Sequence, residues 1–477
     1  MNSQQRHLGR GFNWLGGATI IARVVDFSTI LVVLAFLTKE QVGIASLVIS
    51  IGMIVESLDG LGTSDALIQA SSVSSLQRDT LFWLILAAAI LVGGLTMLFA
   101  PLIAATYGAA SMAGYFVLVA AKQPLVGAAV IPLAMMNRDL QYERIAVVNV
   151  GATLAAALTR LVLAVSGAGA WALVTGFAAS GFFTLIGAWI AKPFRPSLQF
   201  RLPAIVPLLR FGILSAASNA FEQTFKNIDY LLVGWFYGAA PLAIYRVAFD
   251  VAMEPAMAVG TLVNRTALPV FAKVAAVKRD LAQTLSWSLE RLVLLTAPLS
   301  AGLMLAADPL TALLHDDQGH SYAAAALPLK ILAAAALVRV MAFLLLPVMM
   351  GSGRPGTAAR LSAATLVLLG GGILIVGFSL PAPTGIVAVS AVWLAVYALL
   401  LLWGAAYLRR HWDIEVATLA RAFIAPVAGI GALALAALAA RLLLGNGDPK
   451  LQLGIVIAAT ALAYAGLLLH ARARRIS

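Results

Sequence analysis

Long apolar segments follow one another along almost the whole chain, separated by short polar connections, and this pattern restricts the fold more than any other feature. Each segment is 20 to 33 residues long, and about 20 apolar residues in a helix are enough to cross a bilayer. The pattern therefore predicts an all-α polytopic membrane protein of about 14 transmembrane helices. The approximate limits of these helices are 13–37, 41–66, 79–105, 111–136, 143–166, 170–191, 204–236, 239–271, 284–307, 323–350, 358–379, 385–407, 420–444 and 451–470.

The composition agrees with membrane helices and removes several kinds of active site. Of the 477 residues, 62% are hydrophobic and 11% are charged, whereas about a quarter of the residues of a soluble protein are charged. The absence of cysteine excludes disulfides, thiolate metal sites and cysteine catalysis. The five histidines have no metal-ligand spacing, and no P-loop is present. We therefore predict no metal, no nucleotide and no bound cofactor; GSGRPG (351–356) fits a nucleotide motif but follows an apolar helix, not a strand.

The lysines and arginines of the connections are distributed unequally between the two sides. If the N-terminus is inside, nineteen of them lie in inner segments, and only Lys39 and Lys450 lie in outer loops. The positive-inside rule then places both termini in the cytoplasm, as expected of a multi-pass protein of the bacterial inner membrane. Most of the net charge of +12 thus reflects topology and does not indicate a nucleic-acid partner. The first apolar segment is too long for a signal peptide, so we expect it to be retained.

The chain contains a weak internal repeat at a shift of two hundred positions. Phe36 falls on Phe236, Ile44 on Ile244, and Gly60 on Gly260 without a gap. Such repeats are common in secondary transporters, which bind substrate between the halves. We therefore predict two six-helix lobes around a central cavity, with two additional helices. The predicted divisions are 1–192 for the N-terminal lobe, 193–203 for a cytoplasmic linker, 204–410 for the C-terminal lobe, and 411–477 for the last two helices and a basic tail.

Before any family is considered, the charged residues inside the predicted spans are the strongest indication of function. Eleven basic and eight acidic side chains lie there, and each costs about 2.5–3.5 kcal/mol at the centre of a membrane helix. Two interpretations are open for each pair: a local ion pair that holds helices together, or part of a water-filled pathway. Taken together, the charges favour the pathway, because so many of them are tolerable only if most face each other, the interface or water.

The spacing of these charges places several of them on common helix faces. Glu222, Lys226 and Asp229 follow an i, i+4, i+7 pattern, which puts them on one side of a helix. Arg246, Asp250 and Glu254 share one side of the next helix in the same way. Such stripes are typical of helices that line a central cavity.

Several stretches resemble the polysaccharide flippases. GIASLVISIGMIVESLDGLGTSDALIQ (43–69) resembles their "FG…D-x-G-x…ALIQ" signature. FWLILAAAILVGGLTMLFAPLIAATYG (82–108), GAGAWALVTG (167–176) and NIDYLLVGWFYGAAPLAIYRVAFDVAMEP (227–255) follow in the same order, before LPVF at 268–271. The similarity runs across about residues 10–410. It resembles the polysaccharide transporter group of the MOP flippase superfamily, in the branch that serves exopolysaccharides such as colanic acid.

This resemblance implies a transporter that is not an enzyme. Two six-helix bundles would surround a V-shaped cavity and alternate between cytoplasm-facing and periplasm-facing states. The substrate would be an oligosaccharide repeat unit linked to undecaprenyl pyrophosphate, moved from the inner to the outer leaflet for exopolysaccharide or O-antigen-type synthesis. The implied partners are this substrate, the lipid bilayer, a polysaccharide polymerase, and chain-length or export proteins. A proton gradient, a sodium gradient, the membrane potential or product removal would supply the energy.

Under the resemblance, the charged and amide residues fall into three candidate groups. Arginine and lysine suit the pyrophosphate, because they donate charge-assisted hydrogen bonds to phosphate oxygens. Related lipid II flippases also carry functional arginines on their first and eighth helices. The candidate pyrophosphate-binding residues are Arg23, Lys226, Arg246, Lys122, Lys330 and Arg339; the candidate glycan contacts are Asn13, Asn219, Gln223 and Asn227; the candidate ion-coupling carboxylates are Asp26, Glu222, Asp229, Asp250 and Glu254.

Two other functions are weighed against the flippase. A multidrug or cation exporter of the same superfamily usually has an acidic cavity, whereas basic residues outnumber acidic ones in these spans, eleven to eight. A membrane polysaccharide polymerase or ligase needs a sizeable outer loop for its catalytic groups. The longest outer loop, roughly 308–322, is too short to hold a catalytic domain.

Overall fold

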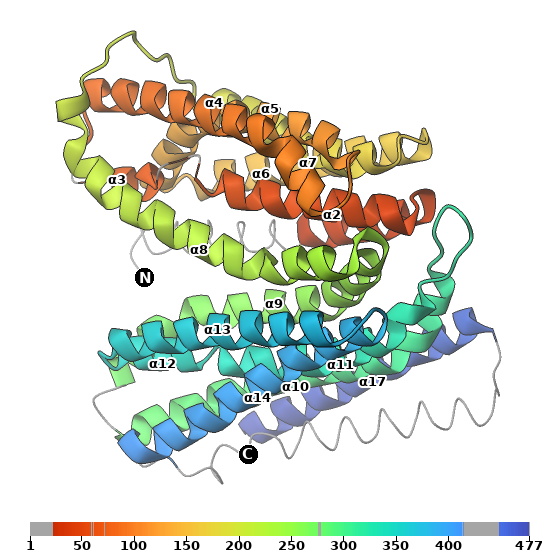
Figure 1. The fold of residues 1–477 in the computed structure, drawn as a ribbon. Coiled ribbons are helices and arrows are strands. Elements are labelled where there is room, and N and C mark those ends of the chain that lie inside the picture. The colour runs from red at the N-terminus through yellow and green to blue at the C-terminus, as the bar shows by residue number, and fades with distance from the viewer. Residues whose placement is uncertain are drawn as a thin grey trace. The chain divides into compact units, whose positions relative to one another are not determined.

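The described part of the chain is helical almost throughout. The computed structural model describes residues 22–476, apart from 59, 61, 71, 275–277, 413 and 415–447. Within these residues, nine helices are long and apolar enough to cross a membrane. This finding confirms an all-α polytopic fold (Figure 1). The predicted helix at 420–444 and the start of the one at 13–37 lie outside the described residues, so the number fourteen stays a prediction.

The first compact unit comprises residues 1–243, together with the short stretch 316–318. Within it, α4 packs along α5, α6 along α7, and α8 along both α2 and α3. The described elements of this unit, in chain order, are residues 22–33, η1 (Leu34–Phe36), α2 (Lys39–Glu56), α3 (Thr63–Gln69), α4 (Ser75–Thr106), α5 (Met112–Arg138), α6 (Tyr142–Val165), α7 (Ala170–Ala191), η2 (Leu202–Ala204) and α8 (Val206–Tyr237).

The second compact unit comprises residues 244–315 and 319–477. Within it, α11 packs against α10 and α14, α13 packs against α14, and α17 packs against α10. The described elements of this unit are α9 (Ala239–Val274, which begins in the first unit), α10 (Lys278–Leu313), η3 (Ala323–Ala325), α11 (Ala326–Ala342), α12 (Leu345–Gly351), α13 (Pro355–Ser379), α14 (Thr384–Trp412) and α17 (Pro449–Ile476).

The chain passes from the first compact unit to the second between Ala243 and Ile244, inside α9; the cytoplasmic linker at 193–203 stays a prediction. Close backbone contacts explain why α8 and the first turn of α9 belong with α2 and α3. A Cβ atom at Gly43 would overlap the carbonyl oxygen of Ala239, and one at Gly62 would overlap the carbonyl oxygen of Gly212. Only glycine allows helices to approach this closely. The assignment of 1–192 and 204–410 to two repeated lobes rests on the repeat and stays a prediction.

Two predicted helices are each interrupted. The segment predicted as one helix at 41–66 ends as α2 at Glu56 and resumes as α3 at Thr63. Gly62 has φ of +62°, in the left-handed region that favours glycine. The segment at 323–350 is likewise divided into α11 and α12. At the first interruption, residues 57–62 read SLDGLG, whose serine, aspartate and glycines are typical of a turn, and the prediction of one helix passed over them. At the second, Phe343 and Leu344 are apolar, so hydrophobicity alone could not reveal it.

Polar residues at helix starts fix where α2 and α4 begin. The Thr38 hydroxyl accepts a hydrogen bond from the Gln41 backbone N–H at 3.2 Å, and the Gln41 side chain accepts one from the Thr38 N–H at 3.0 Å. Ser74 and Gln77 form the same reciprocal pair at the start of α4. Each pair satisfies two backbone donors that the first helical turn leaves unbonded.

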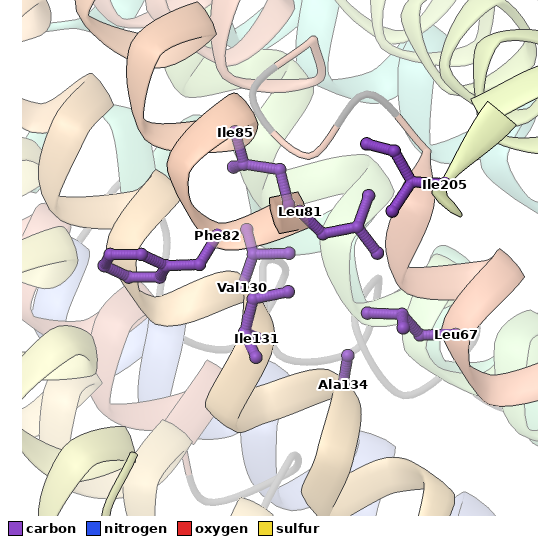
Figure 2. Close-up of a cluster of buried hydrophobic side chains, with 8 residues drawn as sticks. All are labelled: Leu67, Leu81, Phe82, Ile85, Val130, Ile131, Ala134 and Ile205. Atoms are coloured by element: carbon purple, nitrogen blue, oxygen red, sulfur yellow. The ribbon is translucent and has the colours of Figure 1, made fainter. Parts of the chain in front are cut away.

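One apolar cluster joins α3, α4 and α5 to the segment that leads into α8. Its eight side chains are buried, and Figure 2 shows them around Leu81. Ile205, which immediately precedes α8, is fully buried in this cluster. The chain between α7 and α8 is therefore packed into the first unit. The cluster consists of Leu67, Leu81, Phe82, Ile85, Val130, Ile131, Ala134 and Ile205.

Substitution of Gly62 by alanine should destabilise the first unit far more than the same change at Gly108. Both glycines have left-handed backbone angles, +62° and +63°, so the conformational cost of about 1–2 kcal/mol is shared. A Cβ at Gly62 would also lie 2.6 Å from the Ala216 nitrogen, whereas nothing lies within 4 Å of one at Gly108. We expect Gly62→Ala to cost about 1–3 kcal/mol more than Gly108→Ala, measured by denaturant unfolding in detergent micelles. Equal costs would contradict the close packing of α3 on α8.

Candidate functional site

A polar face on α8 is exposed at a depth where the sequence predicts a membrane span. Asn219, Glu222 and Lys226 follow each other at spacings of three and four, so they lie on one side of the helix. The Lys226 Nζ atom lies 2.6 Å from Glu222 Oε1, and the two side chains remain 49% and 61% exposed. Ionised groups are costly in contact with lipid. The exposed pair therefore indicates that this face of α8 borders water.

The same stripe becomes buried further along α8. Asn227 is buried, and its side-chain amide donates a hydrogen bond to the Gln223 carbonyl at 2.8 Å. Asp229 is fully buried, while Gln223 is half-buried. Of the three predicted glycan contacts that the structure describes, Asn219 is thus the most accessible and Asn227 the least; Asn13 lies outside the described residues.

Asp26, near the first helix's described start, pairs with a residue that the sequence did not single out. Its Oδ1 atom lies 2.6 Å from Nη2 of Arg160 on α6, and the Arg160 side chain is largely buried. Gly176 on α7 provides the room, because a Cβ there would lie 3.0 Å from the Arg160 Cβ. Arg23, three residues before Asp26, is exposed. The ion pair therefore links the first helix to α6.

Lys122 is held in a buried ion pair between α5 and the end of α2. Its Nζ atom lies 2.7 Å from Glu56 Oε2 and 3.4 Å from the centroid of the Phe177 ring on α7. Lys122 is 3% exposed, whereas the Glu56 side chain is about one-third exposed. Gly181 leaves space for the lysine stem, because a Cβ there would lie 2.8 Å from Lys122 Cγ. This arrangement makes Lys122 a bridge among three helices.

The second unit contains its own intrahelical pair on α9. Arg246 Nε lies 3.2 Å from Asp250 Oδ2, and both side chains are about one-fifth exposed. Glu254, one turn further along the same stripe, is exposed. Arg246 and Asp250, which the sequence places on one side of this helix, are thus in contact. Separately, Lys330 on α11 pairs with both carboxylate oxygens of Asp308 on α10, at 2.7 and 2.8 Å.

Arg339 on α11 lies among aromatic rings. Its guanidinium carbon is 4.8 Å from the centroid of Trp393 and 5.5 Å from that of Tyr397, both on α14, and 5.6 Å from that of Phe343. Its nearest polarisable contact is Met253 Sδ, 3.9 Å from Nη1. Arg339 is 6% exposed, and no described residue accepts a hydrogen bond from its Nε atom. Aromatic faces therefore provide the attraction that a carboxylate provides for the other buried cations.

The geometry divides the described site residues into exposed and buried groups, with Asp26, Gln223, Arg246, Asp250 and Lys330 half-buried between them. The exposed members can reach a ligand without breaking a buried contact, whereas the buried cations Lys122 and Arg339 contact other helices. Among the described residues, no cluster of three or more histidine, aspartate or glutamate side chains could hold a metal ion. The exposed residues are Arg23, Asn219, Glu222, Lys226 and Glu254; the buried ones are Lys122, Asn227, Asp229 and Arg339.

The family follows from a match across most of the chain. Residues 32–324 match the family described as "Polysaccharide biosynthesis protein". The chain belongs to this family. It is 26% identical to the lipopolysaccharide biosynthesis protein WzxC of Escherichia coli K12, over 55% of this chain and 54% of that protein. It is 25% identical to the teichuronic acid biosynthesis protein TuaB of Bacillus subtilis 168, over 65% of this chain and 64% of that protein. The alignments thus cover less than two thirds of either relative.

Solved structures of transporters share the fold of this family member. The lipid II flippase MurJ in an inward closed conformation matches with a TM-score of 0.76, covering 97% of this chain and 99% of MurJ at 11% identity. An inward-facing multidrug resistance MATE family transporter of the MOP superfamily matches with a TM-score of 0.61, covering 81% of this chain and 95% of that one at 14% identity. These likenesses confirm the predicted all-α transporter fold.

Neutralising Glu56 should destabilise this family member more than neutralising Glu222. Glu56→Gln leaves the Lys122 cation buried without its carboxylate, which we expect to cost about 3 kcal/mol. Glu222→Gln disrupts an exposed pair and should cost less than about 1 kcal/mol. Denaturant unfolding in detergent micelles measures both. The double variant Glu56→Gln/Lys122→Met should recover most of the loss, and no recovery would contradict the pairing.

Trp393 and Arg339 should be energetically coupled. A desolvated cation–π contact contributes about 2 kcal/mol, so Trp393→Leu should cost about 1–2 kcal/mol less in the Arg339→Met background than in the native chain. A double-mutant cycle of unfolding free energies measures this coupling. The matched control replaces Phe82, which lies in the first unit, by leucine in the same two backgrounds. If Phe82 showed the same coupling energy to Arg339 as Trp393, the contact between Arg339 and Trp393 could not be its cause.

Proposed function

We propose that this protein is a flippase that moves oligosaccharide repeat units, linked to undecaprenyl pyrophosphate, from the cytoplasmic to the periplasmic leaflet. The observation that carries the proposal is the family match over residues 32–324. The fold shared with a lipid II flippase over 97% of the chain supports it. The relatives WzxC and TuaB are named for the biosynthesis of bacterial surface polysaccharides. A substrate that joins a lipid to a glycan fits both lines of support.

Exposure suggests which of the candidate residues contact the substrate. Arg23 and Lys226 are exposed cations, and water can solvate the exposed Glu222 carboxylate when Lys226 turns to a pyrophosphate. Asn219 is exposed beside Lys226 on the same face of α8 and suits the hydroxyl groups of a glycan. Arg246 is less accessible and pairs with Asp250, so phosphate would have to compete with that carboxylate. Lys122, Lys330 and Arg339 then serve mainly to hold helices together.

The exposure of each carboxylate also suggests which of them serve in ion coupling. Glu222 and Glu254 are the accessible carboxylates for ion coupling, whereas Asp26 is already bound to Arg160. Translocation makes and breaks no covalent bond, so the protein needs no catalytic group. The proposed location is the bacterial inner membrane, with both ends of the chain in the cytoplasm. A polymerase that removes the flipped unit would draw the process forward.

A transport assay tests the proposal directly. Purified protein is reconstituted in liposomes with a fluorescent oligosaccharide carried on undecaprenyl pyrophosphate, and an impermeant quencher reports the label that reaches the other leaflet. We expect protein-dependent translocation. Absence of translocation with several such donors, together with uptake of a cationic drug, would replace the flippase by an exporter like the MATE transporters.

Arg23→Ala and Lys226→Ala should each lower the initial rate of translocation by roughly tenfold or more. Hydrogen bonds to charged groups contribute about 1.5–3 kcal/mol, and 1.4 kcal/mol corresponds to a factor of ten. The control is Arg360→Ala, which removes an exposed arginine near the start of α13. All three variants should insert and unfold like the native protein. Unchanged rates in both Arg23→Ala and Lys226→Ala would exclude these side chains from substrate binding.

A further inference from the structure

The connection between α7 and α8, residues 192–205, has two chemically different sides. Its sequence is KPFRPSLQFRLPAI, with three basic residues and no acidic ones. We call this segment the strap. It runs without regular structure until the short helix η2 at its end. The side facing the protein and the side facing outward can each be described from the contacts of named residues.

The inner side of the strap is hydrogen-bonded to the first turns of α4. The Trp83 indole N–H donates to the Ser197 carbonyl at 2.9 Å, and the Arg201 backbone N–H donates to the Thr80 hydroxyl at 3.1 Å. The Ser197 hydroxyl donates to the Asp79 carboxylate, and the Gln77 side chain donates to a backbone carbonyl in η2 at 3.0 Å. These bonds fix the strap along α4 at several successive points.

Apolar contacts hold both ends of the strap as well. The Phe194 ring lies edge-on to Phe82 of α4 and to Trp189 of α7, with centroid distances of 5.5 and 6.3 Å. At the other end, Ile205 is fully buried in the cluster of Figure 2. The strap is therefore a fixed part of the first unit, and its outer side presents a defined surface.

The outer side of the strap exposes three large apolar side chains in alternation. Leu198, Phe200 and Leu202 are 88%, 55% and 46% exposed. Gln199 and Arg201 between them are exposed as well, so residues 198–202 form one exposed surface beside Ser197, which bonds to α4. Among the connections that the structure describes, which exclude those through 275–277 and 415–447, no other one exposes more than one large apolar side chain. This surface is therefore unusual within the described chain.

The charges around these apolar side chains are basic. Arg195 and Arg201 are exposed in the strap, and Arg210 is exposed one turn into α8. Lys192 already pairs with Asp139 at 2.6 Å, so the arginines carry the uncompensated charge. No acidic residue occurs between positions 192 and 211. A partner for this surface must combine an apolar layer with negative charge.

We propose that the strap binds the anionic lipid surface of the membrane, with Leu198, Phe200 and Leu202 in the interfacial layer and Arg195 and Arg201 on lipid phosphates. α7 is a candidate membrane span that ends at Ala191, so the strap begins where the chain leaves the bilayer. Apolar side chains flanked by arginines are the composition of segments that lie in the interface. Each arginine near an anionic leaflet strengthens such binding about fivefold. The partner is thus a lipid surface that contains acidic phospholipids.

The absence of native cysteine permits a site-specific probe of this contact. Leu198→Cys in the full chain is labelled with an environment-sensitive fluorophore and placed in nanodiscs of phosphatidylcholine alone or with phosphatidylglycerol. We expect blue-shifted emission, quenched by brominated lipid, that is strongest with phosphatidylglycerol. Gln318→Cys, in an exposed loop beside Asp316 and Asp317, is the control and should respond to neither lipid. Phe200→Cys provides a second reporter on the same side of the strap.

The arginines are tested with the same reporter. Arg195→Gln/Arg201→Gln should remove the difference between the two lipid compositions while the protein remains monodisperse. Emission at 198 that reports water in both compositions would overturn the proposal. So would equal quenching in both, because it would show apolar insertion without anion recognition. Shielding without quenching by brominated lipid would mean that protein covers the strap. None of these measurements requires transport, so they stand or fail independently of the proposed flippase activity.

Discussion

The cost of holding a charge away from water determines where the ionisable side chains of this protein lie. A buried cation must find a carboxylate or an aromatic face, because desolvation costs several kcal/mol when it is uncompensated. Lys122 finds both, in Glu56 and Phe177, and Arg339 finds aromatic rings. Arg160 finds Asp26 on another helix. These contacts connect helices that are far apart in sequence. The need to pair a buried charge, which makes membrane insertion costly, therefore also determines how helices pack within each unit.

Glycine determines how closely the helices that carry these charges can pack. The interruption between α2 and α3 ends α2 at Glu56, and the Lys122 ammonium then lies near the negative end of the helix, where a cation is favoured. Gly62 allows α3 to meet α8, and Gly176 and Gly181 make room for the stems of Arg160 and Lys122. Small residues on α7 thus permit long charged side chains to cross between helices.

The sequence predicts the local features of this structure and misses the long-range ones. Apolar segments predict the helices well, and the i, i+4 spacing predicts the shared helix sides on which Lys226 meets Glu222 and Arg246 meets Asp250. The end of α2 is marked by the turn residues of SLDGLG at 57–62, which the prediction of a single helix over 41–66 passed over. The partner of Asp26 lies 134 residues away, a pairing that spacing rules cannot reach. Trp393 and Tyr397 stand four residues apart, which suggests a shared helix face but not their contact with Arg339 of α11.

Ion pairing and substrate binding are compatible in the exposed pairs and opposed in the buried ones. An exposed pair such as Lys226–Glu222 contributes about 0–1 kcal/mol, so a pyrophosphate can take the lysine at little cost while water solvates the carboxylate. Separating Lys122 from Glu56 would instead leave a buried cation unpaired and cost about 3–5 kcal/mol. A single anionic ligand would have to repay that loss before it bound at all. The exposed pair can therefore keep its cation neutralised in the empty protein and release it to the substrate, whereas the buried pair can only hold the helices.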